Sequence, residues 1–403
     1  MQKFTGKEYL QISIANSFGL DKCTWDQRLD WFKTNENQLD QLIQHAEDPA
    51  MFYAGIQAWR AVQRGEPIGF PISLDATSSG LQILAALTGD RKAAQLCNVV
   101  DTGKREDAYT IIFDRMVNYL TSLGAAAGGI SREDCKQAIM TSLYGSQAEP
   151  KKVFGEGMQL RVFYKMMIDA APAAWDLNET FLEIWNSEAL SHDWVLPDNF
   201  HVHVKVMKQV KETIHFMNQP HDVYYKVNEP TEEGRSLGAN TIHSLDGMIV
   251  REITRRCDYD PNVVLKVTEA LLFAGSGTSS DRPDDLMLIE LWNHYVDTGY
   301  LSARILDYID DKNVGLITPG PIWELIKSLP DKPFKVISVH DCFRVLPNYG
   351  NDLRWQYNNQ LMLIAKSNIL QNLLSQIVGR ELVIGKLDEN MWKDVINTNY
   401  ALS

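Results

Sequence analysis

The sequence is poor in the features that mark secreted, membrane-spanning or disordered proteins. Its 403 residues include only five cysteines, which lie far apart and suit reduced thiols better than a disulfide framework or a structural zinc site. No stretch approaches the roughly 20 consecutive apolar residues that span a bilayer, so no membrane association is expected. Apolar residues make up 45% of the chain, which is typical of a globular protein with a large core.

Positive charge is also scarce. The chain has 39 lysines and arginines against 52 aspartates and glutamates, and its net charge is -13. A protein that binds duplex DNA through many phosphates normally presents a basic face. Net charge is only a sum, however, and an enzyme that holds nucleic acid in one cleft can be acidic elsewhere. The balance therefore indicates weak unaided affinity for DNA without excluding nucleic-acid chemistry.

The spacing of apolar residues predicts many helices and a few short strands. Residues 6–18, 25–46 and 80–87 have helical patterns, whereas residues 70–75 form a short apolar run that predicts a strand ending in Asp75. Residues 335–346 predict a hairpin with Asp341 at its turn. Residues 199–206 and 223–227 predict two further strands that pair with each other. Residues 272–286, rich in glycine and serine, predict a loop.

One predicted helix carries a group of polar side chains at regular spacing. After a glycine-rich break at residues 124–129, Ser131 and Asp134 resemble a capping box, which predicts a helix that reaches about residue 144. Its residues at successive i+4 steps form one stripe; they are Arg132, Lys136, Met140 and Tyr144. Two cations and a phenol suit a nucleoside triphosphate, although a solvated basic face with a half-buried tyrosine is the ordinary alternative.

Asp75 and Asp341 are candidate metal ligands because each ends a β-like run. If the two strands are neighbours in one sheet, the carboxylates converge. Nucleotidyl transfer uses such a pair to bind two magnesium ions about 3.5–4 Å apart, and magnesium prefers oxygen ligands. For either residue alone, the alternative is a strand-end aspartate satisfied by local amides.

Taken in order, four segments resemble the motifs of the single-subunit RNA polymerase family of bacteriophages and mitochondria. They are DATSSGLQ at 75–82, R-x3-K-x7-YG at 132–145, NTIHSLDG at 240–247 and VHDCF at 339–343. The C-terminal NTNYALS resembles the short aromatic tail that ends these enzymes near the active site. Three departures concern fine geometry: Ala76 replaces a glycine, Cys342 replaces a serine, and Met248-Ile249 stand where a second histidine often lies.

The resemblance implies a mainly helical α+β fold, a right-hand polymerase palm with an antiparallel sheet and fingers, without a thumb or an N-terminal promoter domain. Residues 1–123 would form palm helices and the first palm motif, 124–257 the fingers, 258–334 an acidic insert, and 335–403 the palm hairpin and C-terminal tail. The insert is longer than the family usually shows. Between Asp258 and Lys332 it has 13 acidic and 6 basic residues, a net charge of -7. Such an insert either docks a protein partner or is a solvated decoration.

The resemblance also implies roles for individual residues. Asp75 and Asp341 would hold two Mg²⁺ ions, with the Ala76 carbonyl as a further candidate ligand. The other implied roles are triphosphate binding by Arg132 and Lys136, catalysis by Lys136 and Tyr144, recognition of the ribose 2′-hydroxyl by Tyr144 and His243, and a place beside the primer end for His340.

Gly80 bears on the choice between RNA and DNA. Related A-family DNA polymerases carry a glutamate at this position that blocks a ribose 2′-hydroxyl, whereas glycine has no side chain. A site that hydrogen-bonds the hydroxyl also rejects the substrate that lacks it. The sequence therefore favours ribonucleotides.

The function expected is that of the catalytic subunit of a DNA-directed RNA polymerase, which adds ribonucleoside triphosphates to an RNA 3′-hydroxyl on a DNA template and releases pyrophosphate. The chain is either a shortened form of a longer polymerase or one half of a heterodimer whose second polypeptide supplies the thumb and N-terminal parts. We favour the heterodimer, because the chain resembles the larger subunit of the two-chain RNA polymerase of some short-tailed bacteriophages. The cytoplasm of an infected bacterium is then its expected location. A single-stranded-DNA-binding or recruiting protein is a further hypothesis.

Three other functions stay open from the sequence. The chain could be the core of an A-family DNA polymerase, or a non-catalytic polymerase-like subunit that only binds nucleic acid. It could also be a metal-dependent hydrolase that uses His201, His203 and His215.

Overall fold

The structure is a computed structural model that describes residues 1–125, 129–232, 234–273 and 277–403. The described chain is mainly helical and contains three small antiparallel sheets. The predicted break at residues 124–129 and the predicted loop at 272–286 lie partly outside the described residues. No helix among the described residues is long and apolar enough to cross a membrane.

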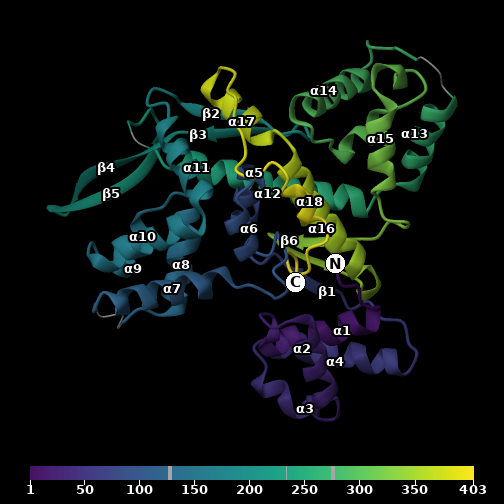
Figure 1. Cartoon of the computed structure of the whole chain (residues 1–403). Coiled ribbons are helices and arrows are strands. Elements are labelled where there is room, and N and C mark those ends of the chain that lie inside the picture. The colour runs from purple at the N-terminus through teal and green to yellow at the C-terminus, as the bar shows by residue number, and fades with distance from the viewer. Residues whose placement is uncertain (126–128, 233, 274–276) are drawn as a thin grey trace.

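Four N-terminal helices form one end of the molecule (Figure 1). They are α1 (Gly6–Ala15), α2 (Trp25–Asn35), α3 (Leu39–Leu42) and α4 (Pro49–Gln63). Thr5 and Thr24 begin α1 and α2 with capping boxes. The helices enclose a small core that includes Phe32, Phe52 and Trp59. Residues 25–46, which were predicted to be helical, form α2, α3 and two short 3₁₀ turns.

A three-stranded sheet joins the two ends of the chain. Strand β1 (Ile72–Asp75) pairs with β7 (Cys342–Val345), which also pairs with β6 (Ile337–Val339). The strand that ends in Asp75 and the hairpin with Asp341 at its turn are therefore confirmed. The C-terminal residues run along the other side of β1: the Ser403 amide donates to the Asp75 carbonyl at 2.9 Å. Asp75 and Asp341 thus lie on neighbouring strand ends.

Three helices pack on one another and share one hydrophobic core with this sheet: α5 (Ser79–Thr88), α12 (Ser236–Cys257) and α16 (Gly350–Lys366). Every residue of α5 is buried, which explains its almost uniformly apolar or small sequence. The shorter helices α6 (Arg91–Leu96), α17 (Ile369–Val378) and α18 (Trp392–Val395) pack around them. Together these elements form the largest hydrophobic core of the described chain.

A helical lobe extends from this core, on the left of Figure 1. It comprises α7 (Ala108–Ser122), α8 (Arg132–Leu143), α9 (Ala148–Phe154), α10 (Met158–Ala170) and α11 (Pro172–Glu183). Helix α8 begins at Ser131, whose side chain accepts from the Asp134 amide while Asp134 reaches back to the Ser131 amide. The predicted capping box and the helix that follows it are confirmed.

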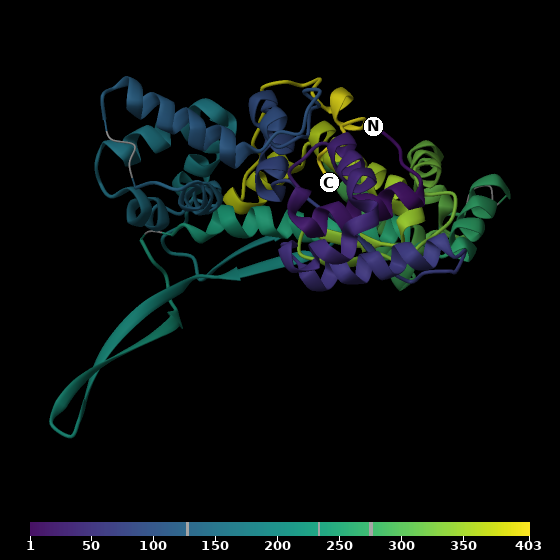
Figure 2. The ribbon, with the colours of Figure 1, turned by 90° about the horizontal axis from the view of Figure 1, so that it is seen from below.

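Two consecutive hairpins follow the helical lobe. Strand β2 (Ser191–Val195) pairs with β3 (His201–Lys205), and β4 (Met207–Phe216) pairs with β5 (Gln219–Asn228). The predicted pairing of 199–206 with 223–227 is therefore wrong. Each strand pairs with its sequence neighbour. Between β4 and β5, Met217 and Asn218 both adopt the left-handed conformation that closes a two-residue hairpin turn. Figure 2 shows the β4–β5 hairpin projecting from the body.

The described part of residues 258–334 contains three α-helices with a hydrophobic core of their own, at the upper right of Figure 1. The helices are α13 (Pro261–Phe273), α14 (Pro283–Thr298) and α15 (Pro319–Lys327). The core includes Val267, Leu288 and Ile322.

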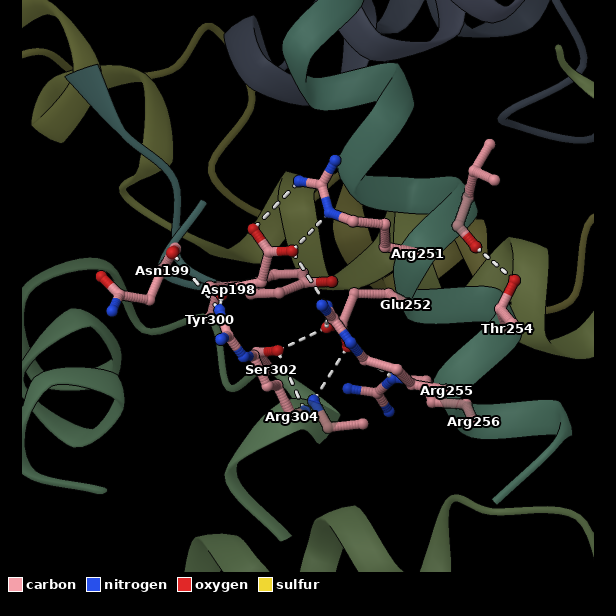
Figure 3. Close-up of polar contacts among 12 residues, drawn as sticks. Asp198, Asn199, Arg251, Glu252, Thr254, Arg255, Arg256, Tyr300, Ser302 and Arg304 are labelled. Carbon is pink, nitrogen blue, oxygen red and sulfur yellow. Dashed lines mark hydrogen bonds and ion pairs between the residues drawn. The ribbon is translucent and has the colours of Figure 1, made fainter. Parts of the chain in front are cut away.

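A buried polar cluster fastens this region to α12 and to the turn between β2 and β3 (Figure 3). Asp198, in that turn, accepts hydrogen bonds from Arg251 Nε at 2.7 Å and from Arg255 at 2.9 Å. Glu252, which lies on α12 with Arg251 and Arg255, accepts hydrogen bonds from Arg256, from the Ser302 hydroxyl and from the Ala303 amide. Both carboxylate side chains are fully buried.

Candidate active site

Asp75 and Asp341 line one cavity of about 470 Å³ beside the three-stranded sheet. Asp75 ends β1, and Asp341 follows β6 in the tight turn that leads into β7. The Ala76 amide donates to the Asp341 carbonyl at 3.1 Å, which ties the two segments together. His340 occupies the left-handed region with φ of 55° and lines the same cavity. The two carboxylates therefore converge as expected for neighbouring strands.

The electrostatics of the cavity favour a bound cation. Loss of surrounding water and repulsion from Asp341 raise the pKa of Asp75 to about 6. The same two causes raise the pKa of Asp246, on α12, to about 6. Carboxylates that repel one another in this way gain when a positive ion lies between them. The donor set therefore fits a hard divalent cation.

A metal held here would need ligands besides these side chains. Among the described residues, no group of three or more histidine, cysteine, aspartate and glutamate side chains is placed to hold a metal ion. Magnesium commonly binds one or two carboxylates and completes its shell with water and substrate phosphates. Asp75 and Asp341 suit that mode of binding better than an all-protein metal cage.

Helix α8 contributes a cation and a phenol to the cavity. Lys136, Met140 and Tyr144 line it together with the two aspartates. Lys136 lies over the Tyr109 ring at 5.8 Å from its centroid. The Tyr109 hydroxyl is in turn 3.1 Å from the Ser78 hydroxyl at the start of α5.

Arg132 does not line this cavity. It lines an adjoining one of about 320 Å³, which shares Asp75 and Lys136 with the first. The Arg132 guanidinium donates to Asp107 and to Glu133, and its Nε donates to the Thr110 hydroxyl at 2.7 Å. The four residues of the predicted stripe are therefore divided between two connected cavities, because the stripe drifts around the helix. Arg105 lines the second cavity as well and donates to the Ser403 hydroxyl at 3.3 Å.

Tyr144, His243 and Gly80 form one contact group. The Tyr144 ring stacks on the His243 ring with centroids 4.7 Å apart and planes 19° apart. A Cβ atom at position 80 would lie 2.5 Å from the Tyr144 hydroxyl oxygen. Glycine is therefore needed at position 80 while Tyr144 holds this position. Burial, and then the charge of Asp246, raise the pKa of Tyr144 to about 12, so the phenol stays protonated and able to donate.

The lining residues that were not among the predicted site residues include a carboxylate, Asp246, and a phenol, Tyr109. Asp246 lies three positions after His243 on α12, so both face the cavity one helical turn apart. That spacing is visible in the sequence. Tyr109 carries no such signal, because only the packing of α7 against α8 brings it to the cavity.

The histidines of the hydrolase alternative lie apart from this cavity. His203 on β3 contacts the Asp193 carboxylate on β2, and His215 lies on the projecting β4. None of the three histidines lines the cavity that holds Asp75 and Asp341. The described residues thus give the hydrolase alternative no support.

The arrangement suits an enzyme that acts on nucleoside phosphates: paired carboxylates on a small antiparallel sheet face a helix bearing a lysine and a tyrosine. Residues 3–153 match the family described as DNA-dependent RNA polymerase. The match contains Asp75, Gly80, Arg132, Lys136 and Tyr144, whereas His243, His340 and Asp341 lie beyond it. The N-terminal part of the chain is therefore similar to DNA-dependent RNA polymerases, which agrees with the family predicted from the motifs.

Individual relatives agree with this assignment. The mitochondrial DNA-directed RNA polymerase of Neurospora crassa is 27% identical over 164 residues, which are 35% of this chain and 12% of that protein. The DNA-directed RNA polymerase of Pseudomonas phage phiKMV is 27% identical over 173 residues, 35% of this chain and 21% of the phage protein. A probable DNA-directed RNA polymerase of Agaricus bitorquis is 22% identical over 376 residues, 76% of this chain and 34% of its own. The chain therefore matches only a minor part of the length of these relatives.

Proposed function

We propose that this chain carries the catalytic centre of a DNA-directed RNA polymerase. In this proposal it adds ribonucleoside triphosphates, in the order set by a DNA template, to an RNA 3′-hydroxyl. The observation that carries the proposal is the meeting of Asp75, Asp341, Lys136 and Tyr144 around one cavity, although they come from separate parts of the sequence.

The carboxylates of Asp75 and Asp341, with the Ala76 carbonyl, are the groups that would hold two magnesium ions. When bound, the ions supply activation of the attacking hydroxyl and stabilise charge on the phosphate and the departing pyrophosphate. The raised pKa of Asp75 supports this assignment, because a cation relieves the repulsion that raises it.

Lys136 is the cation placed to neutralise the triphosphate and to stabilise the leaving group. It lines both connected cavities and has no carboxylate partner among the ion pairs of the described residues. Arg132 would bind phosphate from the second cavity. Since Asp107 and Glu133 already hold its guanidinium, a phosphate would have to share or replace these contacts.

Tyr144 and His243 are proposed to recognise the ribose. Their stacked rings stand over Gly80, where a side chain larger than hydrogen meets the Tyr144 hydroxyl. A protonated phenol at this place is a donor for the 2′-hydroxyl. This geometry favours an RNA polymerase over the A-family DNA polymerase alternative. His340 is proposed to lie beside the primer end.

The division of the chain into palm, fingers and insert, and its partners, are proposed from the resemblance to RNA polymerases. The three-stranded sheet with its covering helices would be the palm, within residues 1–123 and 335–403. Residues 124–257 would be the fingers, and 258–334 an acidic insert. A second polypeptide would supply thumb and N-terminal functions in a heterodimer acting in the cytoplasm of an infected bacterium, with a single-stranded-DNA-binding or recruiting protein as a further partner.

The test is primer extension on a single-stranded DNA template with magnesium and ribonucleotides, comparing wild type with Asp341→Ala. We expect the substitution to abolish synthesis while folding and partner binding persist. Asp114→Ala, an exposed position on α7, is the matched control and should retain activity. Full activity of Asp341→Ala would refute the proposed metal site. A wild-type chain that binds template but never extends a primer would favour the non-catalytic alternative.

A further inference from the structure

Positive charge gathers in the second cavity beside the candidate active site, the cavity of about 320 Å³ that Arg132 lines. The chain as a whole is acidic, with a net charge of -13. Five basic side chains nevertheless line this one cavity, and they come from four separate segments of the sequence: Lys22, Arg105, Arg132 with Lys136, and Arg344. Since basic residues are the minority in this chain, their convergence points to an anionic ligand.

Most of these cations have no carboxylate that neutralises them. Of the five, only Arg132 forms ion pairs; the other four form none among the described residues. Of the four side-chain carboxylates on the wall, Glu106 and Asp107 are already paired. Four unpaired cations therefore face two unpaired carboxylates, Asp21 and Asp75, and the cavity carries an excess of positive charge.

Arg105 is the clearest case of a cation without an anion. It lies between α6 and α7, is partly buried, and donates from Nε to the Ser403 hydroxyl at 3.3 Å. Its two terminal nitrogens have no partner among the described residues, yet they keep accessible surface. Burial lowers the pKa of Arg105, so its charged form is held at a cost that an anion would relieve. A guanidinium with free donors is suited to bind phosphate through two parallel hydrogen bonds.

Arg344 reaches the same cavity from the sheet. On β7 it pairs with Ser73 of β1, which lies two residues before Asp75. Residues directly opposite one another, and residues two apart along a strand, lie on one face of a sheet, so Arg344 is on the same face as Asp75. Arg344 also lines a cavity of about 270 Å³ with Glu47 and Asp48, but it forms an ion pair with neither. The second cavity therefore has two arginines without a carboxylate partner.

The two connected cavities together suit a nucleoside triphosphate. Under the proposed function, the reacting α-phosphate lies at Asp75 and Asp341 in the first cavity. Lys136 lines both cavities, so the phosphates beyond the reacting one pass it and extend into the second cavity. We propose that Arg105 and Arg344 bind the terminal phosphate of the incoming nucleotide there.

This role goes beyond the motifs, which gave phosphate binding to Arg132 and Lys136. Arg132 is held by two carboxylates, whereas Arg105 and Arg344 are not. The direction in which the triphosphate lies rests on the proposed function. The affinity of the cavity for a polyphosphate does not, because it follows from the unpaired cations. Free pyrophosphate offers the same chemistry as the terminal phosphates, so the experiment has to separate the two sources.

Calorimetric titration of the full chain with ATP, ADP and pyrophosphate tests the site. Magnesium is present and template is absent, so synthesis does not contribute to the signal. The test variants are Arg105→Gln and Arg344→Gln, which remove the charge and keep a polar side chain. Arg161→Gln, at an exposed position of α10, is the matched control. Arg105→Lys keeps the charge without the planar fork.

We expect wild type and Arg161→Gln to bind ATP about tenfold more tightly than ADP, the order of magnitude of a charge-assisted contact. Arg105→Gln and Arg344→Gln should bind ATP and ADP about equally, and Arg105→Lys should recover part of the preference for ATP. A merely structural role would weaken ATP and ADP binding alike and leave the preference intact. Because either arginine can be tested alone, the failure of one variant to fold leaves the other decisive.

Absence of a preference for ATP in wild type would overturn the proposal, and a preference retained by a folded variant would overturn the role of the arginine it replaces. A loss confined to pyrophosphate would assign the cations to the released product instead of the incoming nucleotide. A chain that shows the expected binding pattern but never extends a primer would refute the polymerase activity and keep the phosphate site.

Discussion

Replacing Asp198 by alanine should weaken the attachment of the turn between β2 and β3 to α12. The Asp198 carboxylate is fully buried and accepts three hydrogen bonds, two from Arg251 and one from Arg255. The loss would leave two guanidinium groups facing a small apolar side chain. Arg304, whose donor reaches the backbone carbonyl of Asp198, would keep its contact.

The expected loss is about 3 kcal/mol in the free energy of unfolding. Breaking a buried ion pair by removing one partner typically costs about 3–5 kcal/mol. The lower end applies because each arginine side chain is 26% exposed and can recover some water. Arg255 also retains Glu252 as a partner at 2.9 Å.

The loss should depend on pH. Burial alone would raise the pKa of Asp198, but its hydrogen bonds with Arg251 and Arg255 and their charges lower the pKa below its ordinary value. A carboxyl group whose pKa is lower in the folded state contributes stability above its unfolded pKa of about 3.9. That contribution disappears as the pH falls through the folded pKa. The difference between wild type and Asp198→Ala should therefore be equal at pH 7 and pH 5 and smaller below pH 4.

Urea denaturation followed by tryptophan fluorescence measures this difference. Asp193→Ala is the control, because Asp193 pairs with His203 at the surface and its side chain is 55% exposed. Exposed pairs contribute only about 0–1 kcal/mol. A loss of less than about 1 kcal/mol for Asp198→Ala, or a loss equal to that of the control, would refute the structural role given to this cluster.

Three further predictions concern the candidate active site. Gly80→Ala should displace Tyr144 and lower the free energy of unfolding by about 1–3 kcal/mol, measured by thermal or urea unfolding. Gly320→Ala is the control, because a Cβ atom there meets no atom within 4 Å, and it should cause no such loss. Equal stabilities of the two variants would contradict the packing at Gly80. Tyr144→Phe should weaken discrimination between ribo- and deoxyribonucleotides in competition assays while largely preserving rate, and unchanged selectivity would remove Tyr144 from ribose recognition. Because the pKa of Asp75 is raised to about 6, the stability of the metal-free protein should fall as the pH rises from about 4 to 6. For the same reason, magnesium should raise the melting temperature more at pH 7.5 than at pH 5. A magnesium effect that does not depend on pH would count against Asp75 as a ligand.

Features that depend on neighbouring residues were predictable from the sequence. The capping box at Ser131 is a local pattern, and the hairpin around Asp341 is specified by two β-rich runs with a polar turn between them. The convergence of Asp75 and Asp341 followed from placing both at strand ends. It required only that β1 and β7 pair, as they do.

Features that depend on the choice of partner were not predictable. Alternation of apolar and polar residues does not show which strand pairs with which, so residues 199–206 were paired with the wrong segment. In addition, Met217-Asn218 is not a strong turn signal. A helical stripe likewise cannot reveal that Arg132 meets Asp107 on another helix. The second cavity is lined by segments that are far apart in the sequence, so its unpaired cations could not be grouped from the sequence.

Template-directed extension tests the central claim most directly. A labelled RNA primer on a single-stranded DNA template is incubated with magnesium and one ribonucleotide at a time, using the chain alone and together with a candidate second polypeptide. The account predicts extension by one residue only when the ribonucleotide complements the next template base, and much less extension with the matching deoxyribonucleotide. Failure to extend under every pairing, or extension that ignores the template base, would contradict the assignment of Asp75 and Asp341 as the centre of an RNA polymerase.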